Sequence, residues 1–169
     1  ALFLLIALLA VTLSASAASK IKLNKTKITM TKGKSYRLKV SGTKRKVTWS
    51  SSKKSVAAVN SSGKVTAKKK GTAVITAKVG SKRYRCKVTV KQPVTSVKLN
   101  AKSKTLTKGS SVTLKATVRP TNANNRAVTW TTSNKKVATV TSKGKVKAVG
   151  TGTAVITARA KDGSKKYAR

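Results

Sequence analysis

The chain has 169 residues, of which 40 are Lys or Arg and one is acidic, and it has no histidine, so its formal net charge is +39. A chain with no histidine and one carboxylate cannot form a Ser-His-Asp triad or a pair of catalytic carboxylates, and it lacks the ligand sets that zinc and calcium need. A single cysteine cannot form a disulfide within the chain. We therefore expect a non-catalytic protein that uses no metal or cofactor and is attracted to anionic partners.

Residues 1–18 are typical of a partial signal peptide. The apolar run 1–11 is followed by small residues, and Ala15-Ser16-Ala17 is the expected cleavage motif. No initiator Met or basic stretch precedes the run, so the sequence is expected to begin inside the signal. A retained membrane anchor is the alternative, but the run is shorter than the roughly 20 residues of a spanning helix. We expect cleavage, no transmembrane span in the mature chain, and a secreted or cell-surface location.

The remaining sequence is a tandem repeat. Of the 31 residues in 47–77, 20 recur identically 81 positions later, whereas the part upstream recurs with an offset of 76. This period suits a small domain rather than a solenoid unit, so we predict two modules, residues 19–91 and residues 92–169. The change of offset indicates a loop insertion within 119–126 of the second copy. That copy has no counterpart of residues 87–90, so module 2 is expected to be C-terminally truncated.

Alternation of apolar and polar residues predicts β-strands along both modules. Cys86, Val88 and Val90, for example, alternate with Lys87 and Thr89, as on a strand with one buried face. In module 1, strands are expected over 21–24, 27–31, 35–41, 46–51, 57–60, 64–68, 72–79 and 83–90, and the plan repeats from about residue 97. The chain is therefore predicted to be all-β.

Large apolar residues at equivalent positions are the expected core of each module. They are Trp49, Trp130, Leu38, Leu114, Ile75 and Ile156. Each tryptophan lies on a predicted strand beside a valine in phase with it, which favours a position between two sheets. A platform that stacks a sugar or a base is the alternative for both. Cys86 is expected to be a small buried hydrophobe, with a reactive thiol as its alternative.

The order and spacing of several motifs resemble the bacterial immunoglobulin-like domain, group 2, which is found in tandem in surface proteins and in intimin- and invasin-type adhesins. The matching motifs are Leu99-Asn100, Leu106-Thr107-Lys108-Gly109, Val128-Thr129-Trp130-Thr131-Thr132-Ser133, Val137-Ala138-Thr139-Val140, Gly144-Lys145-Val146-Lys147-Ala148 and Gly152-Thr153-Ala154-Val155-Ile156-Thr157-Ala158. The resemblance implies two tandem immunoglobulin-like Greek-key β-sandwiches without an intersheet disulfide. It also implies a spacer or adhesion role, with no shared catalytic residues. Lys53 and Asn134 stand where such domains often carry Asp, which argues against the calcium binding of some relatives.

Lysine-rich turns are the candidate contacts for a polyanion. They contain Lys53, Lys54, Lys68, Lys69, Lys70, Lys135 and Lys136. Lys outnumbers Arg 32 to 8, and an ammonium group is a hydrated point charge, so we expect non-specific, salt-sensitive attachment to anionic cell-envelope polymers or acidic glycans, and non-specific attachment to nucleic acid. Three functions remain open: a structural or adhesive module of an exported bacterial protein, a dedicated polyanion-binding protein, and accessory domains of a cell-wall enzyme whose catalytic domain lies outside this sequence.

Overall fold

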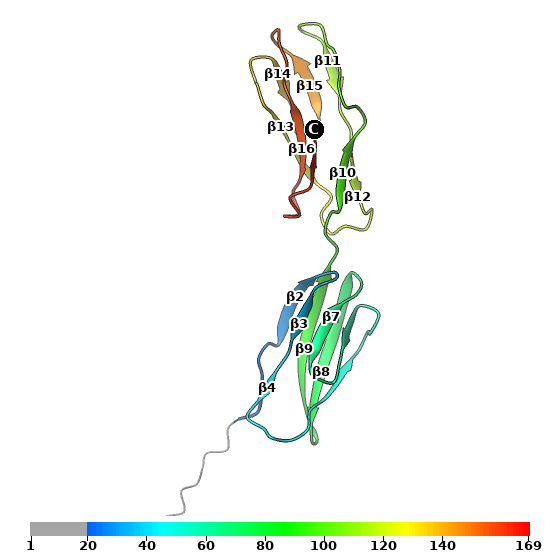
Figure 1. The fold of residues 1–169 in the computed structure, drawn as a ribbon, viewed down its shortest axis with the longest axis vertical. Coiled ribbons are helices and arrows are strands. Elements are labelled where there is room, and N and C mark those ends of the chain that lie inside the picture. Colours follow the sequence, from blue (N-terminus) through cyan, green and yellow to red (C-terminus); the bar gives the residue numbers. More distant parts are fainter. Residues whose placement is uncertain (1–19) are drawn as a thin grey trace, which may run out of the picture.

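The computed structural model describes residues 20–169, which form 17 β-strands and no α-helix. The all-β prediction is confirmed. The strands form two sandwich modules that lie end to end and are joined by an extended connection (Figure 1). No helix that could cross a membrane occurs among the described residues. The segment expected to be a signal peptide, residues 1–18, lies outside them.

Module 1 contains nine strands. They are β1 (Lys22–Leu23), β2 (Lys27–Thr31), β3 (Ser35–Arg37), β4 (Val40–Ser41), β5 (Thr48–Ser51), β6 (Ala57–Val59), β7 (Lys64–Ala67), β8 (Gly71–Val79) and β9 (Lys82–Lys91). One sheet has the order β2-β9-β8-β5, a second has the order β3-β7-β6, and β1 pairs with β4. β2 runs parallel to β9, whereas the other pairs in this module are antiparallel. The first long strand of the module therefore lies beside its last.

The structure corrects the single strand predicted over 35–41. β3 pairs with β7, whereas β4 pairs with β1. Between them, the Leu38 N–H donates to the Gly63 carbonyl at 2.9 Å and the Lys39 N–H donates to Asn24 Oδ1 at 2.9 Å. Because the alternation of side chains continues through the break, the sequence pattern cannot reveal that the chain changes its pairing partner there.

Module 2 contains eight strands. They are β10 (Ser96–Leu99), β11 (Ser111–Thr113), β12 (Ala116–Arg119), β13 (Val128–Thr132), β14 (Ala138–Val140), β15 (Lys145–Ala148), β16 (Ile156–Ala160) and β17 (Tyr167–Ala168). They form the sheets β10-β12, β11-β15-β14 and β13-β16-β17. The plan of module 1 is repeated, but β17 has 2 residues where β9 has 10. The counterparts of β2 and of the first half of β8, residues 103–107 and 152–155, form no strand.

Small apolar residues, mostly Val and Ala, dominate the core of each module. Of the six residues expected in the cores, three are buried: Leu38, Ile75 and Leu114. The other three are only partly buried and pack against a core cluster: Trp49, Trp130 and Ile156. Each tryptophan therefore lies at the border of its core, because so large a side chain is rarely enclosed completely.

Hydrogen bonds tie the connection between the modules to module 2. The Gln92 N–H donates to Asn124 Oδ1 at 2.6 Å, and the Asn124 N–H donates to the Gln92 carbonyl at 2.9 Å. From module 1, the Lys70 ammonium group donates to the Asn122 carbonyl at 3.1 Å. Asn122 and Asn124 lie in the β12–β13 loop, where module 2 carries its predicted insertion. The residues that module 1 lacks therefore build the joint.

Candidate polyanion-binding surface

Two lysine-rich turns of module 1 lie side by side, near the joint. The Val56 carbonyl accepts hydrogen bonds from the N–H groups of Lys68 at 2.8 Å and Lys69 at 3.2 Å, and the Val56 N–H donates to the Lys53 carbonyl at 3.0 Å. The β5–β6 and β7–β8 turns are thus joined through one residue. All five lysines expected here are exposed, and we call them the turn cluster: Lys53, Lys54, Lys68, Lys69 and Lys70.

The equivalent turns of module 2 carry fewer charges. They are joined in the same way, through the Val137 carbonyl, and Lys135 and Lys136 are exposed on the first of them. On the second turn, a Cβ added to Gly150 would collide with the Lys136 carbonyl oxygen. No side chain fits there without a backbone shift, although module 1 carries Lys69 at this position. The structure thus divides the predicted lysines into two unequal groups, one on each module.

A second basic surface lies on the outer face of the β2-β9-β8-β5 sheet. Its members on β9 are exposed and alternate with partly or fully buried residues: Arg83, Arg85, Lys87 and Lys91. Neighbouring strands add Lys27, opposite Lys87, and Lys78, opposite Arg83. We call these six residues the β9 basic row. Neighbouring strands are about 4.8 Å apart and alternate residues about 7 Å apart, so the charges are closely spaced.

The β9 basic row has only an indirect signal in the sequence. Within β9, basic residues alternate with Cys86, Val88 and Val90, and this alternation predicts a strand but not a charged surface. The contribution of Lys27 depends on the parallel pairing of β2 with β9. That pairing joins segments far apart in the sequence, and no local pattern indicates it.

The only acidic side chain of the protein cannot neutralise this surface. Asp162 lies in module 2, where its Oδ2 accepts from the Val94 N–H at 2.5 Å and its Oδ1 accepts from the Ser164 N–H at 3.0 Å. Burial raises the pKa of Asp162, but hydrogen bonds from the Ser164 side chain and from the Val94 and Ser164 N–H groups outweigh it, so the pKa lies below its usual value. Asp162 therefore fixes the connection to module 2.

The like charges of the β9 basic row lie on neighbouring strands and repel each other. A bound anionic polymer would relieve that repulsion.

The chemistry open to the described residues is limited. No group of three or more His, Cys, Asp or Glu that could hold a metal ion occurs within residues 20–169. Cys86 is fully buried in the core of module 1, and burial raises the pKa of its thiol. A buried thiol with a raised pKa is a poor nucleophile, so Cys86 acts as a packing residue.

The exposed part of Trp49 borders a shallow hollow of about 430 Å³, which Arg37, Lys39 and Ser61 also line. The rest of the ring packs against the core cluster of module 1. The alternative of a stacking platform for a sugar or a base is therefore limited to one part of the indole.

A single family model matches the chain twice. The model, described as bacterial Ig-like domain (group 2), matches residues 17–90 and again residues 93–169. The chain is also 42% identical over 125 residues to an uncharacterized protein of Clostridium acetobutylicum, in an alignment that covers 72% of this chain and 13% of that protein.

Two further relatives match about one module each. Kappa-carrageenase of Pseudoalteromonas carrageenovora is 51% identical over 72 residues, which cover 43% of this chain and 18% of the enzyme. An Ig-like virion protein of Serratia phage KSP90 is 44% identical over 73 residues, which cover 43% of this chain and 28% of that protein. The alignments thus span between 13% and 28% of the length of these three relatives.

Proposed function

The chain belongs to the bacterial Ig-like domain family, group 2, and from this membership and its surfaces we propose that the two modules form a non-catalytic spacer of an exported or surface protein, which attaches electrostatically to anionic polymers. The hydrogen-bonded joint is the observation that carries the structural role. The turn cluster and the β9 basic row support the electrostatic role. The signal-like residues 1–18 support the location.

The joint favours a stiff connection. A linker that makes no contacts behaves as a flexible coil, whereas Gln92 is 7% exposed, its N–H donates to Asn124 Oδ1 and its carbonyl accepts from the Asn124 N–H. Pro93 adds a fixed φ angle. The bond from Lys70 to the Asn122 carbonyl joins the two modules directly. A stiff connection between two sandwiches holds whatever is attached at one end away from the other end.

The relatives support a structural or attachment role, because they are proteins of different kinds. A module of this kind forms a minor part of a carrageenase and of a virion protein. Reuse in an enzyme and in a virus particle fits a structural or attachment role better than a catalytic one. The carrageenase also favours a second candidate, in which these modules are accessory domains of an enzyme whose catalytic domain lies outside this sequence.

The basic surfaces support attachment to a polyanion. The turn cluster places five exposed ammonium groups on two joined turns, and the β9 basic row places six cations on one sheet face. Lysine dominates, so the attraction is expected to follow charge density rather than the sequence or stereochemistry of the polymer. Anionic envelope polymers and acidic glycans meet this requirement, and nucleic acid meets it non-specifically. A dedicated polyanion-binding protein is the competing function, and it would require binding that survives physiological salt.

Retention of the full chain on polyphosphate-coated beads tests the electrostatic role. We expect retention at about 50 mM NaCl and release by about 500 mM, because the screening length shrinks to a few ångströms over this range. Retention in high salt would contradict the proposed mechanism. To test the surface, a variant carrying Arg83→Gln, Arg85→Gln and Lys87→Gln is compared with one carrying Lys108→Gln, Lys143→Gln and Lys161→Gln, which are exposed and lie outside the predicted contacts. The first should be released at lower salt, although both lose three charges; equal release would show that the β9 basic row is not the contact.

A further inference from the structure

The hollow beside Trp49 in module 1 combines one aromatic ring with two cations. Its volume of about 430 Å³ lies within the range of small-molecule sites, and its lining includes Trp49, Arg37, Lys39 and Ser61. Trp49 lies on β5 and Arg37 on β3, which are edge strands of the two sheets. The hollow therefore lies where the sandwich is open between its sheets.

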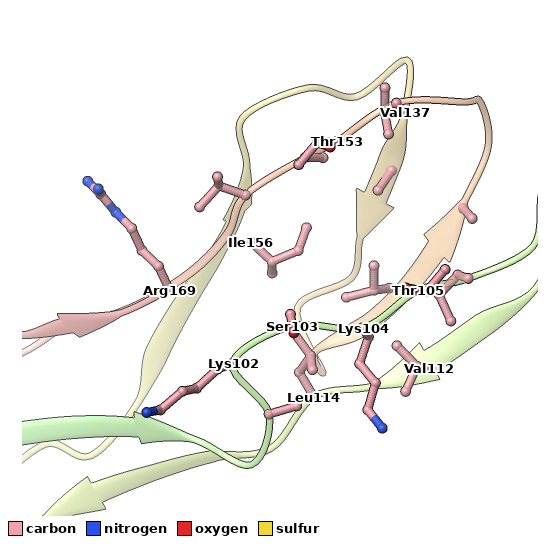
Figure 2. A pocket seen from close by; sticks show the side chains of 18 of the residues that line it. Lys102, Ser103, Lys104, Thr105, Val112, Leu114, Val137, Thr153, Ile156 and Arg169 are labelled. Carbon is pink, nitrogen blue, oxygen red and sulfur yellow. The ribbon is translucent and has the colours of Figure 1, made fainter.

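Both cations lie on the outer side of their segment. Arg37 and Lys39 are exposed, whereas Leu38 between them is 1% exposed and belongs to the core. Figure 2 shows the counterpart of Leu38, Leu114, directed into the interior of module 2. The only acidic side chain, Asp162, is held at the connection to module 2, so neither cation has a side-chain carboxylate partner within residues 20–169. The two charges, about 7 Å apart along the segment, are available to an anionic ligand.

Asparagine side chains fix the backbone on both sides of the hollow. On one side, Asn24 Oδ1 accepts from the Lys39 N–H at 2.9 Å, and Asn24 Nδ2 donates to the Arg37 carbonyl at 3.4 Å. On the other side, in the β6–β7 turn, Asn60 Oδ1 accepts from the Ser62 N–H at 3.1 Å and from the Ser62 hydroxyl at 2.9 Å. The backbone that carries the lining residues is thus positioned before a ligand binds, which lowers the entropic cost of binding.

Module 2 has the same frame but a different lining. Asn100 takes the place of Asn24, and its Oδ1 accepts from the Lys115 N–H at 2.8 Å. The place of Arg37, however, is taken by Thr113. The frame is therefore a structural feature that both modules share, whereas the guanidinium group at this position occurs only in module 1.

We propose that the hollow of module 1 binds one uronic-acid residue of an acidic glycan, an inference that rests on the electrostatic attachment proposed above. The apolar face of the sugar ring, which consists of C–H groups, stacks on the exposed part of the Trp49 indole. The carboxylate accepts two hydrogen bonds from the Arg37 guanidinium, whose fork matches its two oxygens, and Lys39 adds a second positive charge. Ser61 supplies a hydroxyl group for the hydroxyls of the sugar.

A nucleic-acid base is the competing occupant of an indole beside two cations. Proteins that bind single strands stack successive bases on several aromatic side chains, whereas Trp49 is the one aromatic residue among the described residues that line this hollow. A uronic-acid residue carries one ring and one charge in the same unit. The arrangement of one indole beside Arg37 and Lys39 therefore favours the sugar.

An NMR titration of the full ¹⁵N-labelled chain tests the site, because the chain has one tryptophan in each module and their indole N–H groups give separate signals. The probe is digalacturonate, at about 150 mM NaCl to screen long-range attraction. Galactobiose is the control without charge, and glutarate is the control with two carboxylates but no sugar ring. We expect digalacturonate to shift the signals of Trp49 and of residues 37–39 and 61–62 saturably, with a Kd about fivefold or more below that of either control. The Trp130 signal should change much less.

Three results of this titration would overturn the proposal. Equal binding of glutarate would show a plain anion site, and tighter binding of a thymidine dinucleotide would show a base platform. Absence of a saturable shift of the Trp49 signal at millimolar digalacturonate would show that no sugar binds there.

A pair of variants then tests the role of Arg37. Arg37→Thr introduces the residue that module 2 carries at this place, and Arg126→Thr removes the same charge from an exposed loop position of module 2. The first should raise the Kd of digalacturonate about fivefold, as expected for the loss of one exposed ion pair, and the second should leave it unchanged. An equal Kd in both variants would overturn the assignment of Arg37.

The bead experiment separates this proposal from the proposed function. If the unaltered chain binds polyphosphate beads at low salt but does not bind digalacturonate, the glycan site is wrong and the electrostatic role stands. If the chain is not retained on the beads even at low salt, the electrostatic role itself is wrong.

Discussion

Gly63 lies directly against the indole of Trp49. A Cβ added to Gly63 would be 2.8 Å from Trp49 Cζ2 and 2.5 Å from the Leu38 carbonyl oxygen, and the same two distances recur at Gly144 in module 2. The φ angle of Gly63 is +77°, in a region that side-chain-bearing residues avoid. In both modules, the backbone approach that positions the tryptophan therefore depends on glycine.

Replacing this glycine should destabilise module 1. We expect Gly63→Ala to lower the free energy of unfolding by about 2–4 kcal/mol, since the left-handed backbone costs about 1–2 kcal/mol and the overpacking against Trp49 adds to it. Urea unfolding followed by tryptophan fluorescence measures the change. Gly33→Ala is the control, because Gly33 has a φ of +85° and nothing within 4 Å of an added Cβ. It should cost only the backbone contribution, and an equal loss in both variants would refute the role assigned to the indole contact.

Salt should stabilise module 1. The cations of the β9 basic row repel each other, and dissolved ions screen that repulsion. We expect the melting temperature to rise as NaCl increases from about 20 to 500 mM, as measured by circular dichroism. A variant with Lys27→Gln and Lys87→Gln, which face each other, should show a flatter rise than one with Lys34→Gln and Lys44→Gln. A melting temperature independent of salt in the unaltered chain would contradict the repulsion.

Acid should weaken module 2 through Asp162. The pKa of this group is lowered in the folded state, so its contribution to stability is complete above the unfolded pKa of about 3.9 and is lost as the pH falls through the lower folded pKa. Because Asp162 is the only acidic side chain, an Asp162→Asn variant should lose this acid dependence. Thermal unfolding between about pH 2 and pH 7 measures both proteins. Parallel curves would show that the Val94 contact does not depend on the charge.

The joint should loosen when Asn124 is shortened. Asn124→Ala removes the acceptor of the Gln92 N–H, so the modules should sample a wider range of relative orientations while each keeps its own stability. Small-angle X-ray scattering measures this wider range of orientations as a shorter maximum dimension and a broader distribution of fitted conformations. Asn125→Ala in the same loop is the control, since Asn125 Oδ1 accepts only from Ala127 within module 2. A scattering curve for Asn124→Ala that matches the control would contradict the stiff joint.

The sequence was sufficient for those parts of the fold that depend on local pattern. Two-residue alternation predicted most strands, and the shift in repeat offset located the loop insertion between β12 and β13. The break between β3 and β4 and the parallel contact between β2 and β9 depend on partners elsewhere in the chain, so no local pattern contains them. The lysines of the turn cluster were found because they lie in runs. The arrangement of the β9 basic row became visible only with the sheet.

The repeated segment Gly-Thr-Ala-Val-Ile-Thr-Ala shows most clearly that a local sequence does not determine burial or strand formation by itself. Its copy at 71–77 lies entirely within a strand, whereas only the last three residues of its copy at 152–158 do. Ile75 is fully buried, and Ile156 is only partly buried. Identical residues thus differ in structure because β9 covers the first copy and no strand of the described chain covers the same part of the second. The residues of this segment therefore do not by themselves determine its burial, which depends on whether a counterpart of residues 87–90 covers it.

The parallel pairing of β2 with β9 determines how module 1 responds to tension. When the module is stretched between its two ends, the force passes through the two-residue β1, which pairs only with β4, to the start of β2 and leaves at the end of β9. These two points lie at opposite ends of the β2–β9 pair, which runs from Lys27 beside Lys87 to Thr31 beside Lys91. The strands are then loaded in shear, so their hydrogen bonds share the load along the whole contact and do not open one after another. A protein held under flow or traction through this module would extend little before that contact breaks as a unit.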